Sequence, residues 1–197
     1  MPFEIEGHGW EMHVKRLGLQ HRAAERVRTY GAYQVFIDGA PVMSLSGHIC
    51  ECTGPGDNAE HGKEKHLRIR EGRYALSTQL GDHYRSVGFT DDDTHPMPGF
   101  LLLGTEDRSA VLVHPGHPPS LYLSSIGCFN PPKPLKADQD MSFAESRVRV
   151  IAMIDSLRQH DPAAFATDKI GQNTPIAQAF IVVDGEPMTE VSDEAIA

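Results

Sequence analysis

The sequence predicts a mainly β fold of the α+β class, in which short strands form a sandwich or barrel and one helix packs on them near the C-terminus. Two patterns predict strands: apolar side chains alternate over residues 10–17, and an Asp-Gly turn signal stands at 38–39 between two apolar runs. One pattern predicts the helix, because Ser142 and Glu145 form a capping box ahead of apolar residues with helical spacing over 143–159. Such a chain is expected to bury its core between a sheet and that helix.

In the first half of the chain, a hairpin is expected between two irregular segments. Residues 33–37 and 41–45 form its arms, and the second arm is expected to continue to residue 52. Residues 18–30 are polar and basic, so a loop or a short helix is expected there. Residues 53–66 begin with Gly, Pro, Asp and Asn, a composition typical of a loop.

The second half contributes the remaining strands. Residues 81–99 and 115–137 are expected to be irregular, and the second of these segments contains six prolines. The tail over 186–197 is acidic and is expected to be frayed. We find no internal repeat, so a single domain is expected over 1–197, with its core at about 10–185. Apolar runs predict strands at 74–77, 100–103, 110–114 and 179–183.

Composition indicates an ordinary globular protein and argues against two classes of function. The 197 residues are 40% hydrophobic and 23% charged, which suits one core without disulfides. The formal net charge of -9 argues against nucleic-acid binding. No apolar run reaches the roughly 18 residues that a membrane span needs. The acidic start lacks the apolar segment of a signal peptide, so we expect synthesis in the cytoplasm, with export by a dedicated secretion machine or association with a phage for any outside role.

Three cysteines are too few for a disulfide scaffold. Cys50 and Cys52 fall on one face of a predicted strand and are expected to pack in the core. With His48, His61 and His66 they also offer zinc ligands, although the Cys-x-Cys spacing fits a tetrahedral site poorly. We therefore expect neither a metal nor another cofactor, with a metal at this cluster as the alternative.

The segment that leads to the third cysteine, Cys128, carries the pattern most typical of catalysis. A predicted strand ends at His114, and fourteen residues later Gly127 and Cys128 lie in a predicted turn. A thiol nucleophile needs a nearby base or a positive environment in order to ionise. Gly127 lets the backbone approach closely and can aim amide N–H groups at an oxyanion. The sequence therefore predicts Cys128 as nucleophile and His114 as base, with a thiol pKa below the ~8.5 of a free cysteine.

These residues resemble the L,D-transpeptidases of the YkuD type. That family has a histidine at a strand end and then Ser/Thr-His-Gly-Cys, and residues 125–128, Ser-Ile-Gly-Cys, are similar to the second element. Residues 68–74, Arg-Ile-Arg-Glu-Gly-Arg-Tyr, and 114–116, His-Pro-Gly, are similar to elements of a small uncharacterised bacterial and phage branch of these domains. The resemblance covers about residues 10–160.

The resemblance implies a transpeptidase-like fold and chemistry on the stem peptides of peptidoglycan. In the family the cysteine thiolate attacks a peptide carbonyl and forms an acyl-enzyme. An amine acceptor then gives a cross-link or exchange, and water gives carboxypeptidase-type cleavage. A backbone carbonyl orients the base histidine, so no acidic third residue is needed. The implied partner is peptidoglycan or a muropeptide, and no oligomeric state is predicted.

Neighbouring residues are expected to line the substrate site. His117 is also an alternative base, because a Pro-Gly turn places it near His114. Two positions depart from the family: Ile126 stands where the motif has histidine, and Asn130 stands where an arginine binds the donor peptide. The nucleophile and base are retained, whereas the charge for a donor carboxylate is missing. The expected substrate-binding residues are Tyr122, Ser124, Ser125, His117 and Asn130.

Two other classes of function fit the same residues. A binding module would keep the fold for recognition of cell-wall peptides, with weak or no catalysis, and its affinity would survive loss of Cys128. An accessory protein of a phage or secretion particle would instead associate stably with another protein.

Overall fold

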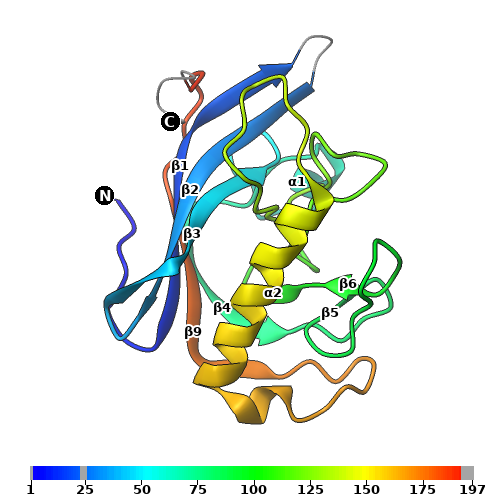
Figure 1. Ribbon diagram of the computed structural model, residues 1–197. Coiled ribbons are helices and arrows are strands. Elements are labelled where there is room, and N and C mark those ends of the chain that lie inside the picture. The colour runs from blue at the N-terminus through cyan, green and yellow to red at the C-terminus, as the bar shows by residue number, and fades with distance from the viewer. Residues whose placement is uncertain (1, 23–25, 192–197) are drawn as a thin grey trace.

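The computed structural model describes residues 2–22 and 26–191 and contains a curled seven-stranded sheet with one long helix packed against it (Figure 1). The mainly β, α+β fold class predicted from the sequence is therefore confirmed. The strand order in the sheet is β3-β2-β1-β9-β4-β7-β8. Those strands are β1 (Trp10–Arg22), β2 (Arg26–Ile37), β3 (Ala40–Glu51), β4 (Gly72–Thr78), β7 (Phe100–Leu103), β8 (Leu112–Val113) and β9 (Pro175–Asp184).

The remaining elements are short, apart from the C-terminal helix. A second sheet joins β5 (Tyr84–Arg85) to β6 (Met97–Pro98) inside the segment predicted to be irregular. Helix α1 (Glu60–Glu64) lies in the segment predicted to be a loop, and a 3-10 turn, η1 (Pro162–Phe165), follows the long helix. That helix, α2 (Phe143–His160), is capped by Ser142, whose side chain accepts a hydrogen bond from the Glu145 amide as predicted. No helix among the described residues is long and apolar enough to cross a membrane.

The predicted hairpin is confirmed at its turn and in both arms. Strands β2 and β3 pair in antiparallel register on either side of Asp38 and Gly39. Both turn residues have positive φ, 49° and 78°, which is the geometry of the two-residue turns that follow the twist of a sheet.

The prediction of a loop or short helix over 18–30 is wrong for the part that the structure describes; residues 23–25 lie outside it. The end of β1 and the start of β2 occupy this segment, and the two strands stay paired as far as Arg22 and Arg26. Gln20 lies directly opposite Arg28. Both side chains are buried, and Arg28 Nε donates to Gln20 Oε1 at 2.8 Å. A buried pair of large polar side chains hides the apolar alternation by which a strand is recognised.

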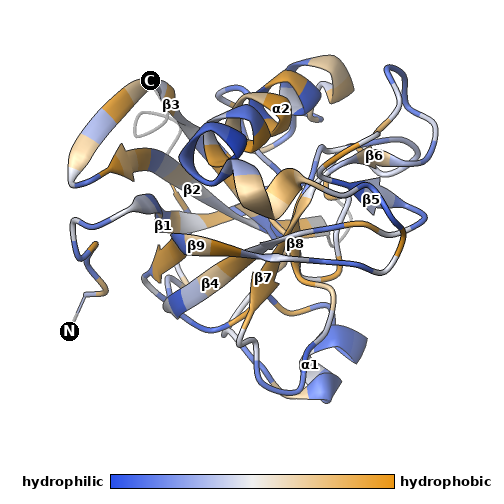
Figure 2. Cartoon of the chain, turned by 90° about the horizontal axis from the view of Figure 1, so that it is seen from below, coloured by the Kyte–Doolittle hydropathy of each residue, from blue (hydrophilic) through white to orange (hydrophobic). Residues whose placement is uncertain are grey.

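The core lies between the curled sheet and α2 (Figure 2). Val150, Met153, Ile154 and Leu157 line the buried face of the helix and pack against apolar side chains of the sheet. Trp10 is fully buried at the start of β1, and its Nε1 donates to Ser156 Oγ of α2 at 3.0 Å. The helix is therefore fixed to the sheet by apolar packing and by one long-range hydrogen bond.

Residues 129–130 link the two edges of the sheet. Phe129 pairs with Val113 of β8 in parallel register, and Asn130 pairs with Cys50 of β3 in antiparallel register. Four backbone hydrogen bonds hold the link, of which the shortest join the Phe129 amide to the Leu112 carbonyl and the Cys50 amide to the Asn130 carbonyl, both at 2.8 Å. This closure holds the residue before it, Cys128, beside β8.

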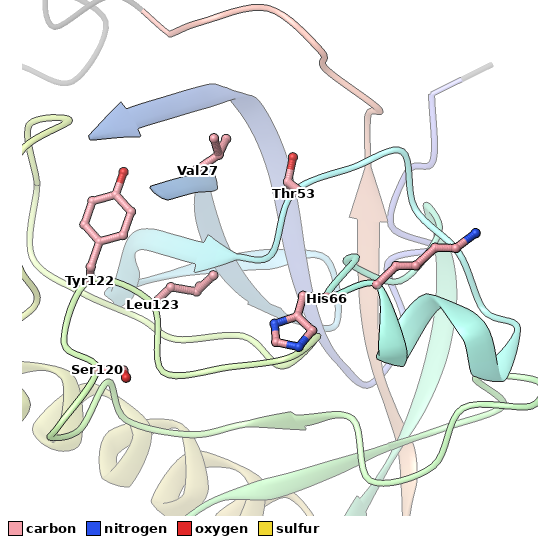
Figure 3. Close-up of a pocket in the computed structure, with 7 residues that line it drawn as sticks. Val27, Thr53, His66, Ser120, Tyr122 and Leu123 are labelled. Carbon is pink, nitrogen blue, oxygen red and sulfur yellow. The ribbon is translucent and has the colours of Figure 1, made fainter. Parts of the chain in front are cut away.

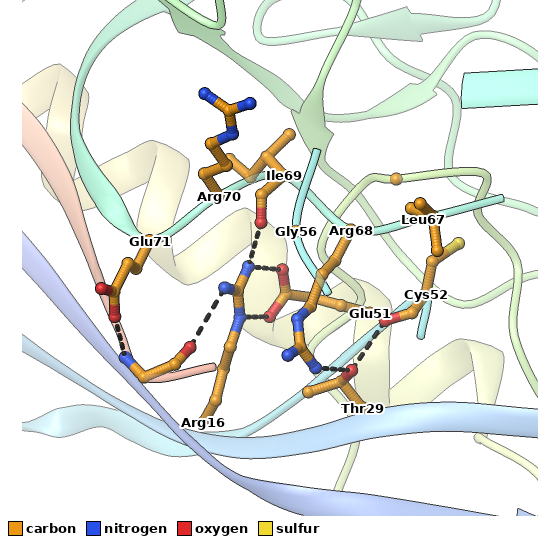
Figure 4. Close-up of polar contacts among 12 residues, drawn as sticks. Arg16, Thr29, Glu51, Cys52, Gly56, Leu67, Arg68, Ile69, Arg70 and Glu71 are labelled. Atoms are coloured by element: carbon orange, nitrogen blue, oxygen red, sulfur yellow. Dashed lines mark hydrogen bonds and ion pairs between the residues drawn. The ribbon is translucent and has the colours of Figure 1, made fainter. Parts of the chain in front are cut away.

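A buried charge network fixes the loop between β3 and β4 (Figure 4). Arg16 forms a two-pronged ion pair with Glu51, with N–O distances of 2.7 and 2.9 Å, and both side chains are fully buried. Arg68 is also buried, and it pairs with Glu186 at 2.7 Å and donates to Thr29 Oγ1 at 2.6 Å. The network therefore ties the loop to strands β1, β2 and β3 and to the chain after β9.

The start of the acidic tail is ordered by backbone pairing. The Leu19 amide donates to the Thr189 carbonyl at 2.8 Å, and the Val191 amide donates to the Leu19 carbonyl at 3.0 Å. The prediction of a frayed tail is therefore wrong up to residue 191, while 192–197 lie outside the described residues.

Candidate functional site

Cys128 and His114 project from the same face of the closure. Val113 and Phe129 are paired and point to one face. Because side chains alternate along a strand, the adjacent residues His114 and Cys128 both point to the opposite face. Both Cys128 and His114 line a cavity of about 350 Å³. The sequence prediction that a strand-end histidine and a Gly-Cys turn come together thus agrees with the position of both residues in one cavity wall.

A backbone carbonyl fixes the tautomer of His114. Its Nδ1 lies 2.8 Å from the Pro115 carbonyl oxygen, and since a carbonyl only accepts, Nδ1 carries the proton. The lone pair is therefore on Nε2, which has no hydrogen-bond partner among residues 2–22 and 26–191. Burial lowers the pKa of His114 to about 3, so the ring is neutral at pH 7 and Nε2 carries no proton. The same burial makes the ring a weaker base than a free imidazole.

The thiol of Cys128 is partly exposed and held by backbone groups. The Leu112 amide donates to Cys128 Sγ at 3.4 Å, and Sγ lies 3.6 Å from the Ala110 carbonyl oxygen. Burial raises the pKa of the thiol above its ordinary value, although nearby Arg108 and Lys63 oppose the rise. The prediction of a thiol that ionises below the free-cysteine pKa is therefore corrected: at pH 7 the pair is a neutral thiol and a neutral imidazole.

No hydrogen bond joins His114 to Cys128 among the described side chains. Proton transfer between them therefore needs a rotation of one side chain or a bridging water. Such loose geometry is common before substrate binds, because the contacts of a catalytic pair tighten in the complex with substrate.

The other two cysteines pack in the core, as predicted. Burial raises the pKa of Cys50 to about 11 and that of Cys52 to about 12, so both are inert as nucleophiles. No group of three or more His, Cys, Asp or Glu side chains with metal-site geometry occurs in the described part of the chain.

Gly127 is required by its backbone and by a neighbouring arginine. Its φ of 139° is rarely adopted by residues with a side chain, and a Cβ there would lie 1.7 Å from Arg108 Nη2. The Arg108 guanidinium therefore lies directly against the backbone that precedes the thiol. It donates to the Ile126 carbonyl at 2.8 Å and to the Leu67 carbonyl at 2.7 Å. The sequence pattern did not reveal Arg108, because it follows an ordinary polar turn.

The Ser125 hydroxyl occupies two backbone amides beside the thiol. The amides of Gly127, at 2.8 Å, and Cys128 both donate to Ser125 Oγ. Two amides that converge on one oxygen beside a nucleophile form the arrangement of an oxyanion hole. The amides that Gly127 was predicted to supply are thus present, and the Ser125 hydroxyl must rotate away before a substrate oxygen can use them.

Tyr84, which the sequence reasoning missed, forms another wall of the cavity. Its ring packs on the His114 ring with centroids 4.4 Å apart. Its hydroxyl lies 2.8 Å from Nε2 of His117, whose Nδ1 donates to the Pro118 carbonyl. The unprotonated Nε2 of His117 therefore faces the Tyr84 hydroxyl and not the thiol. This orientation argues against His117 as the alternative base. Tyr84 gave no signal because it lies in a loop-like polar segment.

The remaining predicted substrate residues divide into two groups. Ser124 and Ser125 line the cavity, as expected, but Ser124 Oγ bonds the backbone of residues 117 and 120. Asn130 is fully buried, and its Nδ2 donates to the His114 carbonyl at 3.1 Å and lies 3.3 Å from His114 Nδ1. The prediction that Asn130 binds substrate is corrected, because a buried side chain packed behind the histidine positions that residue instead.

Tyr122 lines a different cavity, of about 450 Å³ (Figure 3). Its hydroxyl donates to the Gln20 carbonyl at 3.1 Å, and the Arg28 guanidinium lies 4.2 Å from its ring centroid. The prediction that Tyr122 contacts a substrate at Cys128 is therefore corrected. Thr53, Lys65 and His66 form the opposite wall of this second cavity.

The buried neutral histidine predicts a dependence of stability on pH. The His114 pKa is about 3 in the folded protein and near 6.5 when unfolded, so below pH 6.5 the unfolded state binds more protons and stability falls. From pH 7 to pH 5 this residue alone is expected to cost about 2 kcal/mol of unfolding free energy.

Urea unfolding of wild type and His114→Gln at both pH values measures this difference. The loss from pH 7 to pH 5 is expected to be about 2 kcal/mol smaller in the variant, whatever its absolute stability. Equal losses in the two proteins would contradict a buried neutral His114.

Comparison with known proteins adds no relative, since no family model, curated protein or solved structure matches the chain.

Proposed function

We propose that the protein is a cysteine-dependent acyltransferase or hydrolase that acts on peptidoglycan stem peptides, as an L,D-transpeptidase or L,D-carboxypeptidase does. The observation that carries the proposal is the cavity wall that contains both a partly exposed thiol and a neutral histidine with a free Nε2. The Gly127 and Cys128 amides converge on Ser125 Oγ beside that thiol. These are the nucleophile, base and oxyanion stabiliser that acyl transfer needs. The choice of a peptidoglycan substrate rests on the resemblance of the motif.

His114 Nε2 accepts the thiol proton as Cys128 Sγ attacks the substrate carbonyl carbon, so ionisation accompanies attack and does not precede it. The Gly127 and Cys128 amides stabilise the developing oxyanion once Ser125 has moved. His114 then donates its proton to the leaving amine, and an amine or water releases the acyl group.

Purified muropeptides and mass spectrometry test the proposal. Wild type is expected to give cross-linked products or to remove a terminal D-amino acid, and Cys128→Ala is expected to give neither. Cys52→Ala is the matched control, because Cys52 is a buried thiol with a pKa near 12. Equal product from wild type and Cys128→Ala, or none from either, would argue against the proposal.

One observation favours a binding module as the second candidate. The resting thiol is protonated and makes no hydrogen bond to His114 among the described side chains, so the same cavity suits non-covalent recognition. In that case muropeptides bind to wild type and Cys128→Ala with equal affinity, and neither protein changes them.

A further inference from the structure

The thiol of Cys128 borders two cavities of opposite character. The larger one is lined by Tyr84, Leu112 and His114, with Asp82 as the one carboxylate among the residues that line it. A second one of about 130 Å³ is lined by Lys63 and Arg108. Lys63 and Arg108 are the charged residues of that smaller cavity, and both are cations. The thiol is therefore flanked on one side by aromatic and apolar groups and on the other by positive charge.

Arg108 is a buried cation without a carboxylate partner among the described residues. It is 5% exposed, and its hydrogen bonds go to the neutral carbonyls of Asp57, Leu67 and Ile126. Its Nε–H is buried and unpaired. A buried charge is costly unless an anion or several strong acceptors surround it. This guanidinium therefore retains a positive charge, with no carboxylate against it among the described residues, beside the nucleophile.

The other buried arginines show how this chain usually compensates such charges. Arg16 pairs with Glu51 and Arg68 pairs with Glu186, each at 2.7 Å. Arg28 pairs with no described carboxylate, but each of its three nitrogens donates to an oxygen and its guanidinium stacks on Tyr122. Arg108 has three carbonyl acceptors but no carboxylate partner among the described residues, its Nε is unpaired, and it is the one of these arginines that lines a cavity with the thiol.

Lys63 adds a second, accessible charge. It comes from helix α1, and its side chain is 41% exposed. Its contact with Glu60 is long, at 3.9 Å, and solvent weakens it. The cavity volume of 130 Å³ corresponds to roughly four water molecules at ~30 Å³ each, so it accommodates a group of a few atoms.

We propose that Lys63 and Arg108 form an anion-binding subsite that takes a carboxylate lying within one residue of the carbonyl attacked by Cys128. The subsite supplies the charge that position 130 lacks, from two residues distant in sequence. Its peptide substrate is thus an acyl donor with a free carboxylate close to the reacting bond. For peptides this inference rests on the proposed acyl chemistry, whereas the positive subsite itself does not.

Alkylation of Cys128 tests the subsite without any peptide chemistry. Iodoacetate and iodoacetamide form the same S–C bond and release iodide, and they differ in charge. Because both react with the same thiolate, the ratio of their rates is independent of the thiol pKa. The iodoacetate to iodoacetamide ratio at Cys128 is expected to be about fivefold higher than for 2-mercaptoethanol at the same pH and low salt.

Lys63→Met is the informative variant, because Arg108 also holds three loop carbonyls and its removal endangers folding. Lys63→Met is expected to lower the ratio at least twofold, and Lys65→Met, which removes an equal charge next to the other cavity, is expected to leave it unchanged. Peptide mapping assigns the label to Cys128. A wild-type ratio equal to that of 2-mercaptoethanol, or an unchanged ratio in Lys63→Met, overturns the subsite.

Donor peptides separate this inference from the proposed function. A stem tetrapeptide with a free C-terminal carboxylate is expected to have a kcat/KM at least tenfold above that of its C-terminal amide, and Lys63→Met is expected to reduce the difference. Equal turnover of both peptides overturns the subsite and leaves the acyl chemistry standing. Turnover of neither peptide, with a raised alkylation ratio, overturns the acyl chemistry and leaves the anion subsite standing.

Discussion

His114→Gln is expected to lower kcat/KM for acyl transfer about 10³-fold, the order of magnitude that a general base contributes. The thiol is protonated at pH 7, and the neutral ring with a free Nε2 is its proposed proton acceptor. Glutamine has a similar size and can still donate to the Pro115 carbonyl, but its amide accepts no proton. Turnover of muropeptides or a model peptide at pH 7 measures the effect.

His117→Gln is the matched variant for this prediction. Because His117 Nε2 is directed at the Tyr84 hydroxyl, its loss is expected to reduce kcat/KM less than tenfold. A larger loss in His117→Gln than in His114→Gln would reverse the assignment of the base.

Glu51→Gln is expected to destabilise the folded protein by about 3 kcal/mol or more. The Glu51 carboxylate is fully buried and accepts both prongs of Arg16, so the amide removes the charge and one acceptor while the arginine stays buried. Part of the Arg16 charge remains compensated by Glu186 at 3.0 Å, which keeps the expected loss at the lower end for a broken buried pair. Denaturant unfolding at pH 7 measures it.

Glu106→Gln serves as the control for Glu51→Gln. Its carboxylate makes a long contact of 3.8 Å with Arg70, and both side chains are more than half exposed. The same chemical change there is expected to alter the unfolding free energy by less than about 0.5 kcal/mol. A similar loss of unfolding free energy in the two variants would show that the buried Arg16–Glu51 pair stabilises the fold no more than the exposed Arg70–Glu106 contact does.

Strong local signals explain which elements the sequence predicts correctly. The Asp38-Gly39 turn and the Ser142 cap are short-range features whose physics is complete within a few residues. The end of β1 and the start of β2 could not be predicted from such local features. Their polar side chains are buried only because partners such as Gln20 and Arg28 meet across the pair, and those partners are tertiary.

The residues of the candidate site also divide into those that a local sequence pattern marks and those that only the tertiary structure brings in. Cys128, His114 and Gly127 are close in sequence and carry a recognisable spacing, so the sequence indicates them. Tyr84, Lys63 and Arg108 reach the thiol from three separate loops or short elements, and no local pattern marks them. Asn130 illustrates the opposite error, since its place after the Gly-Cys step indicates a substrate contact, whereas the closure of the sheet buries it behind His114.

The most direct test of the central claim is the intact mass of the protein within seconds of mixing with a donor muropeptide. Wild type is expected to gain the mass of the acyl portion, with the added group on Cys128 and sensitive to hydroxylamine as a thioester. Cys128→Ala is expected to gain none, and His114→Gln to acquire the adduct about 10³-fold more slowly. A wild-type protein that binds the muropeptide yet never carries the acyl group would contradict a catalytic Cys128.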